Sequence, residues 1–200
     1  MGVKHTTKRN DFPSMKKRID DVNGQAIEVG VLQGKSKWLA GIHEYGCDIK
    51  PGRAEYLTVP LTPEASERKA RSFSNTFVYK AKSGNKFIAR KKGDSLELLY
   101  WLTKSVKIPE RSFLRAGFDK HRDDVMKKAH LMMADVISGK MSAEALFKGV
   151  GGELSSKIKD YARDLDSPPN SPITIENKGS SNPLHDTGDM IGGITWRKAK

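Results

Sequence analysis

The chain has 200 residues, 36% of them hydrophobic and 30% charged, with a formal net charge of +12 at pH 7. This length fits one domain, or one domain with an extended arm. The apolar fraction lies below the usual globular range, so we expect a modest core with long exposed segments. The sequence contains no apolar run of about 18 residues and begins without an apolar signal core, so we expect a soluble, non-exported chain without a membrane partner.

The cysteine count and the charge restrict the chemistry further. Cys47 is the single cysteine, so no intrachain disulfide is possible, and this fits a reducing cytoplasm. The positive charge predicts attraction to polyanions, and it leaves two readings open, a generally basic surface and direct contact with nucleic acid.

Residues 1–20 are polar and basic, and we interpret them as a mobile basic arm or a short solvated helix. An arm that orders only on a partner is the functional alternative. Residues 21–200 are then expected to form a single domain.

The domain begins with a strand near 26–32, where Ile27, Val29 and Val31 alternate with other residues. A short helix follows, capped by Ser36 and ended by Gly46. One side of this helix carries Trp38, Leu39, Ile42 and Tyr45.

The middle of the chain predicts an antiparallel meander over residues 75–108, preceded by a strand near 56–61. Pro60 places that earlier strand at a sheet edge or a strand end. Thr62-Pro63-Glu64 predicts the start of a helix that reaches about Phe73. Ser83-Gly84-Asn85 predicts the turn of a projecting hairpin over about 75–92.

The hairpin region also has the densest group of basic residues: Lys80, Lys82, Lys86, Arg90, Lys91 and Lys92. With Phe77, Tyr79 and Phe87 nearby, it could form a platform for single-stranded nucleic acid. Alternation places these aromatics on the face opposite Lys80 and Lys82, so burial in the core explains them better.

Two amphipathic helices follow, at about 110–138 and 142–165. Pro109 suits the start of the first helix, Gly139 its end, and Ser142 the cap of the second. Because only a few residues join them, the helices should lie antiparallel. Three glycines lie inside the second helix, which predicts close approach of a neighbouring backbone or a bend: Gly149, Gly151 and Gly152.

The C-terminal part reads as a proline-rich loop over residues 167–183 and a last strand near 194–197. Ile173-Thr174-Ile175 is a possible short strand within the loop. The whole pattern predicts an α+β fold, in which one antiparallel sheet packs against the two antiparallel helices.

No catalytic arrangement emerges from the residues. Asp186-Thr187-Gly188 is the tripeptide of aspartic peptidases, but it occurs once and lacks the apolar strand that should precede it. His43 and Cys47 are four residues apart, but two potential ligands do not make a metal site. We therefore predict no catalytic, metal-binding or cofactor-binding residues.

Four stretches, taken in order, resemble a known family. They are Ile42-His43-Glu44-Tyr45-Gly46, Ile108-Pro109-Glu110-Arg111-Ser112-Phe113-Leu114-Arg115, Ser167-Pro168-Pro169-Asn170, and Asn182-Pro183-Leu184-His185-Asp186-Thr187-Gly188-Asp189-Met190 with Ile194-Thr195-Trp196. This order resembles the tail-completion, or head–tail joining (neck), proteins of long-tailed bacteriophages, including relatives described as minor tail components or virion morphogenesis proteins. Ser112 stands where that family often has proline, and Gly192-Gly193 where a polar residue and serine are usual.

The resemblance implies a structural protein of the virion, made in the host cytoplasm, and not an enzyme. Such subunits form a homo-oligomeric ring, often a hexamer, that caps the tail tube or its terminator and docks to the connector or adaptor of the head. Genomic DNA passes through the lumen. A tail terminator and a head-side adaptor are close alternatives, and a basic DNA-binding accessory protein of a mobile element is an alternative from another class.

Overall fold

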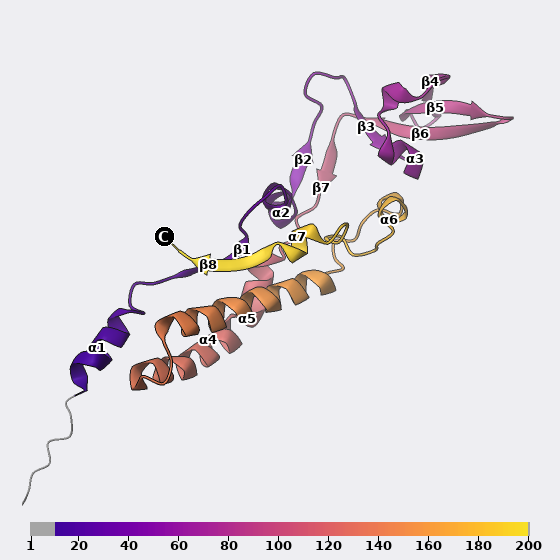
Figure 1. Cartoon of the computed structure of the whole chain (residues 1–200). Coiled ribbons are helices and arrows are strands. Elements are labelled where there is room, and N and C mark those ends of the chain that lie inside the picture. The colour runs from indigo at the N-terminus through magenta and orange to yellow at the C-terminus, as the bar shows by residue number, and fades with distance from the viewer. Residues whose placement is uncertain (1–10, 200) are drawn as a thin grey trace, which may run out of the picture. The chain divides into compact units, whose positions relative to one another are not determined.

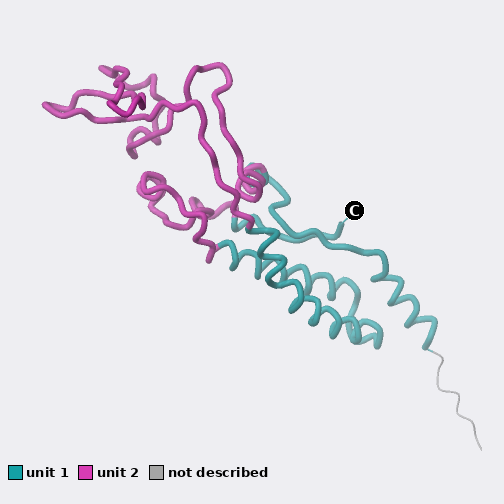
Figure 2. Tube along the Cα trace, turned by 180° about the vertical axis from the view of Figure 1, so that it is seen from behind, with its two compact units in different colours: residues 1–37, 113–162, 191–200 teal, residues 38–112, 163–190 magenta. Residues whose placement is uncertain are grey.

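The structure is a computed structural model that describes residues 11–199. The chain divides into two compact units, shown in two colours in Figure 2. Unit 1 comprises residues 1–37, 113–162 and 191–200, and unit 2 comprises residues 38–112 and 163–190. The α+β class is confirmed. The single domain from residue 21 onward stays a prediction, and residues 1–10 of the expected arm lie outside the described residues.

Unit 1 is built on the two long helices, α4 (Leu114–Ser138) and α5 (Ala143–Asp164), which lie side by side in Figure 1. Gly139 ends α4 with a left-handed φ of 81°, and the Ser142 hydroxyl accepts a hydrogen bond from the Ala145 N–H at 3.2 Å. The end of α4 at Gly139 and the cap of α5 at Ser142 were both predicted. The start of α4 was predicted at the wrong residue, because Pro109 follows a strand and the helix begins five residues later.

Helix α1 (Phe12–Asp20) contacts α4 near the C-terminal end of α4. The Arg18 Nε donates to the Ile137 carbonyl at 3.0 Å, which ties the helix to α4 through one of its basic residues. The second half of the expected arm is therefore a helix attached to unit 1.

The first and last strands form a ribbon in unit 1. β1 (Ile27–Val31) pairs antiparallel with β8 (Ile194–Lys198), so that Val29 lies opposite Trp196. Ile194 is fully buried, and Trp196 packs against the cluster around Val136, Leu146 and Phe147. The ribbon thus covers part of the helix pair with its alternate apolar residues.

Unit 2 contains a four-stranded antiparallel sheet with the order β3-β6-β5-β4. Its strands are β3 (Leu57–Pro60), β4 (Thr76–Lys80), β5 (Lys86–Lys92) and β6 (Ser95–Thr103), and the predicted hairpin is β4–β5. Pro60 lies in an edge strand, as predicted. One face of this sheet carries the unit's buried cluster, which consists of Ala65, Phe73, Leu99 and Tyr100.

The prediction of one sheet was wrong, because the strands within residues 11–199 form three sheets. Besides β1–β8 and the four-stranded sheet, β2 (Cys47–Ile49) pairs with β7 (Val106–Ile108). The meander breaks between β6 and β7, where the Thr103 hydroxyl donates to the Ser105 carbonyl at 2.9 Å. A side chain that bonds its own backbone in this way replaces a rung of the ladder and ends the strand.

Unit 2 also contains the short helices α3 (Pro63–Glu67) and α6 (Pro172–Lys178), and a third short helix is α7 (Asp189–Gly192). The helix expected up to Phe73 stops early because Arg68 is extended, and a single 3-10 turn, Ala70–Ser72, follows. The strand suggested at Ile173–Ile175 is instead α6. The Ser171 hydroxyl caps that helix by accepting from the Thr174 N–H, and Gly179 ends it.

A helix forms where one was predicted, α2 (Ser36–Tyr45), and the sequence did not indicate which of its sides is buried. The buried residues are Ala40 and Glu44, whereas Trp38 is 74% exposed and Tyr45 67% exposed. Trp38 and Tyr45 therefore face solvent, whereas the Glu44 side of the helix forms internal hydrogen bonds. In residues 11–199, no helix is both long and apolar enough to cross a membrane.

Candidate functional site: a buried polar cluster and an apolar groove

A buried arginine organises unit 2. Arg111 is 5% exposed; its Nε donates to the Pro168 carbonyl at 2.8 Å, and its Nη2 lies 3.3 Å from both the Pro169 carbonyl and Asn170 Oδ1. Burial lowers the pKa of this guanidinium. One planar group thus holds three consecutive residues of a distant loop, which its several fixed donors allow.

The end of α2 meets the same segment. The Arg111 backbone N–H donates to the His43 carbonyl at 2.7 Å, and the Ser112 hydroxyl donates to Glu44 Oε1 at 2.8 Å. Gly46 has a φ of 70°, and a Cβ there would lie 2.9 Å from the Glu110 backbone nitrogen. Only glycine fits both the left-handed backbone and this close approach.

Asn182 fixes the start of the C-terminal motif. Its Nδ2 donates to the Arg163 carbonyl at 2.7 Å and to the Leu165 carbonyl at 3.2 Å. Its Oδ1 accepts from the backbone N–H groups of Leu184 and His185 at 2.8 and 2.9 Å. An asparagine that bonds the backbone two residues on is a common turn former, and here it also reaches the end of α5.

These contacts bring parts of all four motif stretches into one site, which we call the Arg111 cluster. It consists of His43, Glu44, Gly46, Arg111, Ser112, Pro168, Pro169, Asn170 and Asn182. Asn170 links the last two stretches, since its Nδ2 lies 3.5 Å from the Asn182 carbonyl. The side-chain hydrogen bonds within the cluster connect segments of unit 2 to one another, and the arrangement serves to hold them in place.

Burial lowers the pKa of His43 to about 4, and the nearby charges of Arg111 and Lys178 add to the effect. Burial also lowers the pKa of Lys178, whose Nζ lies 3.5 Å from the Pro183 carbonyl. His43 is therefore neutral at pH 7, which avoids a further positive charge beside the buried guanidinium.

The other candidate residues lie apart from this cluster or at its surface. Asp186 and Thr187 are exposed in the Asp-Thr-Gly turn, and the Thr187 hydroxyl donates to Asp189 Oδ2 at 2.9 Å. Cys47 lies in β2 and not on the helix of His43. Over residues 11–199, no group of three or more His, Cys, Asp or Glu side chains gathers as metal ligands do.

The predicted basic patch is partly neutralised. Arg90 forms ion pairs of 2.6 Å with Glu64 and with Glu97, and Lys92 pairs with Glu97 at 3.3 Å. The pKa values of both carboxyl groups are lowered, chiefly by the hydrogen bonds from Arg90. These ion pairs reduce the positive charge that the hairpin could offer to the phosphates of a nucleic acid.

The aromatic residues of the hairpin are not buried in the core as expected. Tyr79, Phe87 and Trp101 lie opposite one another on three neighbouring strands, and all three are half-buried. Their face is the one opposite Tyr100 and the buried cluster, because alternate residues of a strand point to opposite sides. Phe77, next in this row, is 42% exposed.

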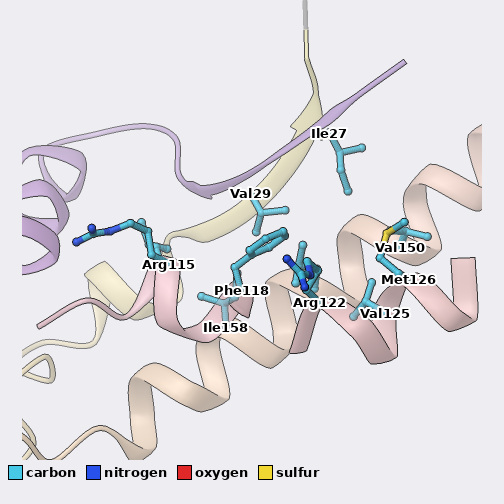
Figure 3. A pocket seen from close by; sticks show the side chains of 11 residues that line it. Ile27, Val29, Arg115, Phe118, Arg122, Val125, Met126, Val150 and Ile158 are labelled. Atoms are coloured by element: carbon cyan, nitrogen blue, oxygen red, sulfur yellow. The ribbon is translucent and has the colours of Figure 1, made fainter. Parts of the chain in front are cut away.

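Unit 1 contains an apolar groove of about 370 Å³, which sequence reasoning missed (Figure 3). Val29 of β1 and Phe118 of α4 point toward each other across it. It is lined by Ile27, Val29, Leu114, Arg115, Phe118, Arg122, Val125, Met126, Val150, Leu154 and Ile158. The sequence predicted an amphipathic helix here, and at the groove Phe118 of α4 is 40% exposed and Met126 is 47% exposed.

The positive charge is concentrated in unit 1. That unit has 20 lysines and arginines against 11 aspartates and glutamates, a net charge of +9, whereas unit 2 has 16 against 13, a net charge of +3. The basic hairpin of unit 2 is thus balanced by acids elsewhere in that unit.

No protein-family model matches this chain, and no curated protein or solved structure matches it significantly.

Proposed function

We propose that this protein is a structural subunit of a tailed-bacteriophage virion that completes the tail and joins it to the head as part of a neck ring. The observation that carries the proposal is the Arg111 cluster. The stretches that resemble the tail-completion family are scattered over some 150 residues of sequence, and parts of each meet in one hydrogen-bonded site. Motif residues that hydrogen-bond distant segments to one another support a structural role that the family would share, and they do not support a catalytic centre.

Exposed apolar side chains support a role in assembly. Trp38 and Tyr45 stand out from α2, and Phe77 and Val78 from the edge strand β4, with exposures of 42% to 74%. Tryptophan and tyrosine are enriched among the residues that dominate protein–protein interfaces. A ring needs two different surfaces on each subunit, and surfaces on separate elements can serve that geometry.

The experiment is a stop codon early in this gene in the parent phage, with lysates examined by negative-stain electron microscopy. Full heads and separate, unjoined tails are expected. Tails of abnormal length would favour a terminator, and intact infectious particles would overturn the virion role.

Complementation sharpens the same experiment. A plasmid copy with Trp38→Ala should restore joining poorly, whereas Lys148→Ala, an exposed residue of α5, should restore it fully. Equal rescue by both would remove Trp38 from the proposed assembly surface.

The +9 charge of unit 1 favours one second candidate, a DNA-binding accessory protein of a mobile element. Tight binding to duplex DNA that weakens steeply with salt would support this alternative. Weak binding that disappears at moderate salt would exclude it.

A further inference from the structure

The four-stranded sheet of unit 2 has one blocked edge and one open edge. Its two edge strands are β3 and β4. In β3 the Leu61 N–H donates to the Leu99 carbonyl at 2.8 Å, so the nitrogen of Pro60, one residue earlier, is directed to the outer edge. Proline has no N–H to donate, and an edge that carries proline resists pairing with a further strand.

Strand β4 has no such protection. It contains neither proline nor glycine, and its Phe77 and Val78 are 42% and 64% exposed. The Ala81 N–H donates to the Asn85 carbonyl at 2.9 Å, which shows which residues of this strand bond to β5. The backbone N–H and C=O groups of the alternate residues therefore point away from β5, toward the open edge, and these residues are Thr76, Val78 and Lys80.

The sequence of β4 suits antiparallel pairing with the same strand of a second copy. In a pair centred on Val78, this residue lies opposite itself, and Thr76 lies opposite Lys80. Every N–H and C=O group that points to the open edge then gains a hydrogen-bond partner. Phe77 lies opposite Tyr79 of the second copy in a pair whose Cα atoms are about 4.5 Å apart, where aromatic side chains stabilise a sheet.

The charges favour this register and this partner. A pair centred on Lys80 would place two lysines directly opposite each other, which is destabilising, whereas the pair centred on Val78 places a threonine opposite each lysine. The net charge of unit 2 is +3, against +9 for unit 1. Two copies that meet through unit 2 therefore repel each other less than two copies that meet through unit 1.

The pairing also continues a row of aromatic residues. Tyr79, Phe87 and Trp101 lie opposite one another on β4, β5 and β6, and all three are half-buried. Phe77 of the second copy would extend this row across the new boundary, beside Tyr79. Aromatic pairs at such positions stabilise a contact beyond the area that they bury.

We propose that two copies of this chain pair through the open edges of their β4 strands and form a dimer with twofold symmetry. The two four-stranded sheets become one continuous sheet, and Pro60 at its outer edges prevents the addition of further copies. The contact is isologous, so it joins two copies and does not by itself close a ring. The proposal therefore concerns the free protein and does not depend on the neck role.

Sedimentation velocity of the full chain over a range of concentrations tests the pairing. The interface is small, so we expect a reversible dimer with a Kd on the order of 10 μM. The measured mass should rise from that of one chain, 22.2 kDa, toward twice that value as the concentration increases.

Matched variants locate the contact. Val78→Pro removes the central N–H from the open edge, as Pro60 does in β3, and should weaken dimerisation at least about tenfold. Val78→Lys should weaken it similarly, because it places two like charges opposite each other at the twofold axis. Thr58→Lys makes the same change of charge at an exposed residue of the blocked edge, so it should leave the Kd within about twofold. Circular dichroism checks the fold of each variant, and Val78→Lys keeps the test valid if Val78→Pro loses structure.

Hydrogen exchange followed by nuclear magnetic resonance tests the register. The amide of Val78 should gain protection as the protein concentration rises, and so should those of Thr76 and Lys80. The amides of Phe77 and Tyr79 point to β5 and should keep the protection that they have in the monomer.

Several results would overturn the proposal. One is a chain that stays monomeric at about 200 μM, well above the expected Kd. Others are dimerisation that neither Val78 variant weakens, dimerisation that Thr58→Lys weakens as much as Val78→Lys does, and amides of β4 whose protection does not depend on concentration. Because these measurements use purified protein, they are independent of the phage experiment, and either proposal can fail without the other.

Discussion

Gly151 of α5 allows a sharp test of the packing in unit 1. A methyl group at this position would lie 2.6 Å from Trp196 Cε3 and 2.7 Å from Trp196 Cγ. Carbon atoms normally approach to about 3.5 to 4.0 Å, so Gly151→Ala must displace the indole by about 1 Å. The displaced ring belongs to β8, so the change also strains the pairing of β8 with β1.

The neighbouring glycine provides the matched control. A methyl group at Gly152 would meet no atom within 4 Å. Replacing a helical glycine by alanine stabilises a helix by about 1 kcal/mol, and both substitutions share this gain. Overpacking costs about 1 to 3 kcal/mol and applies to Gly151 alone. We therefore expect Gly152→Ala to stabilise the protein by about 1 kcal/mol and Gly151→Ala to destabilise it by about 1 kcal/mol.

Thermal unfolding followed by circular dichroism measures the difference. For a chain of this size, 1 kcal/mol shifts the midpoint by about 2 to 4 °C, so the two variants should differ by roughly 4 to 8 °C. In a Trp196→Leu background the difference should shrink, because the ring that opposes the methyl group is gone. Equal stabilisation by both alanines would refute the contact between Trp196 and α5.

Two further predictions concern the Arg111 cluster. Arg111→Lys should destabilise the protein by about 2 to 4 kcal/mol in urea unfolding, because lysine cannot reproduce the hydrogen bonds to the Pro168 and Pro169 carbonyls. The exposed control Arg71→Lys should change the free energy of unfolding by less than about 0.5 kcal/mol. Equal effects of the two substitutions would contradict the central role of Arg111. The pKa of His43 is about 4 in the folded protein, against an ordinary value of 6.5. Between these pH values the unfolded chain binds more protons than the folded protein does. The contribution of neutral His43 to folding stability is therefore complete above pH 6.5 and is lost as the pH falls toward 4. After allowance for partial exposure we expect about 1 to 2 kcal/mol. His43→Gln should flatten the stability profile in this pH window, and an unchanged profile in His43→Gln would contradict the assignment.

Much of the local structure could be predicted from the sequence alone. The alternation of Ile27, Val29 and Val31, the hairpin turn at Ser83-Gly84-Asn85, and the caps at Gly139 and Ser142 each depend on residues within a few positions of one another. Such signals act through backbone propensity and neighbouring hydrogen bonds, and they need no distant partner. Ile173-Thr174-Ile175 was misread because its β-branched residues outweighed the capping serine and proline beside it.

The tertiary structure alone decided which of these pieces meet. The pairing of residues 27–31 with residues 194–198 joins the two ends of the chain, and no local pattern specifies it. The same holds for Arg111, whose role depends on the carbonyl groups of residues 168 and 169. It also holds for α2, which buries Glu44 and exposes Trp38 because Glu44 bonds Ser112. Periodicity shows that a helix or strand has an apolar face, but the surface that covers this face is set by contacts between segments far apart in the chain. For that reason the sequence predicted an amphipathic α4 and could not show that part of its apolar stripe lies open beside β1.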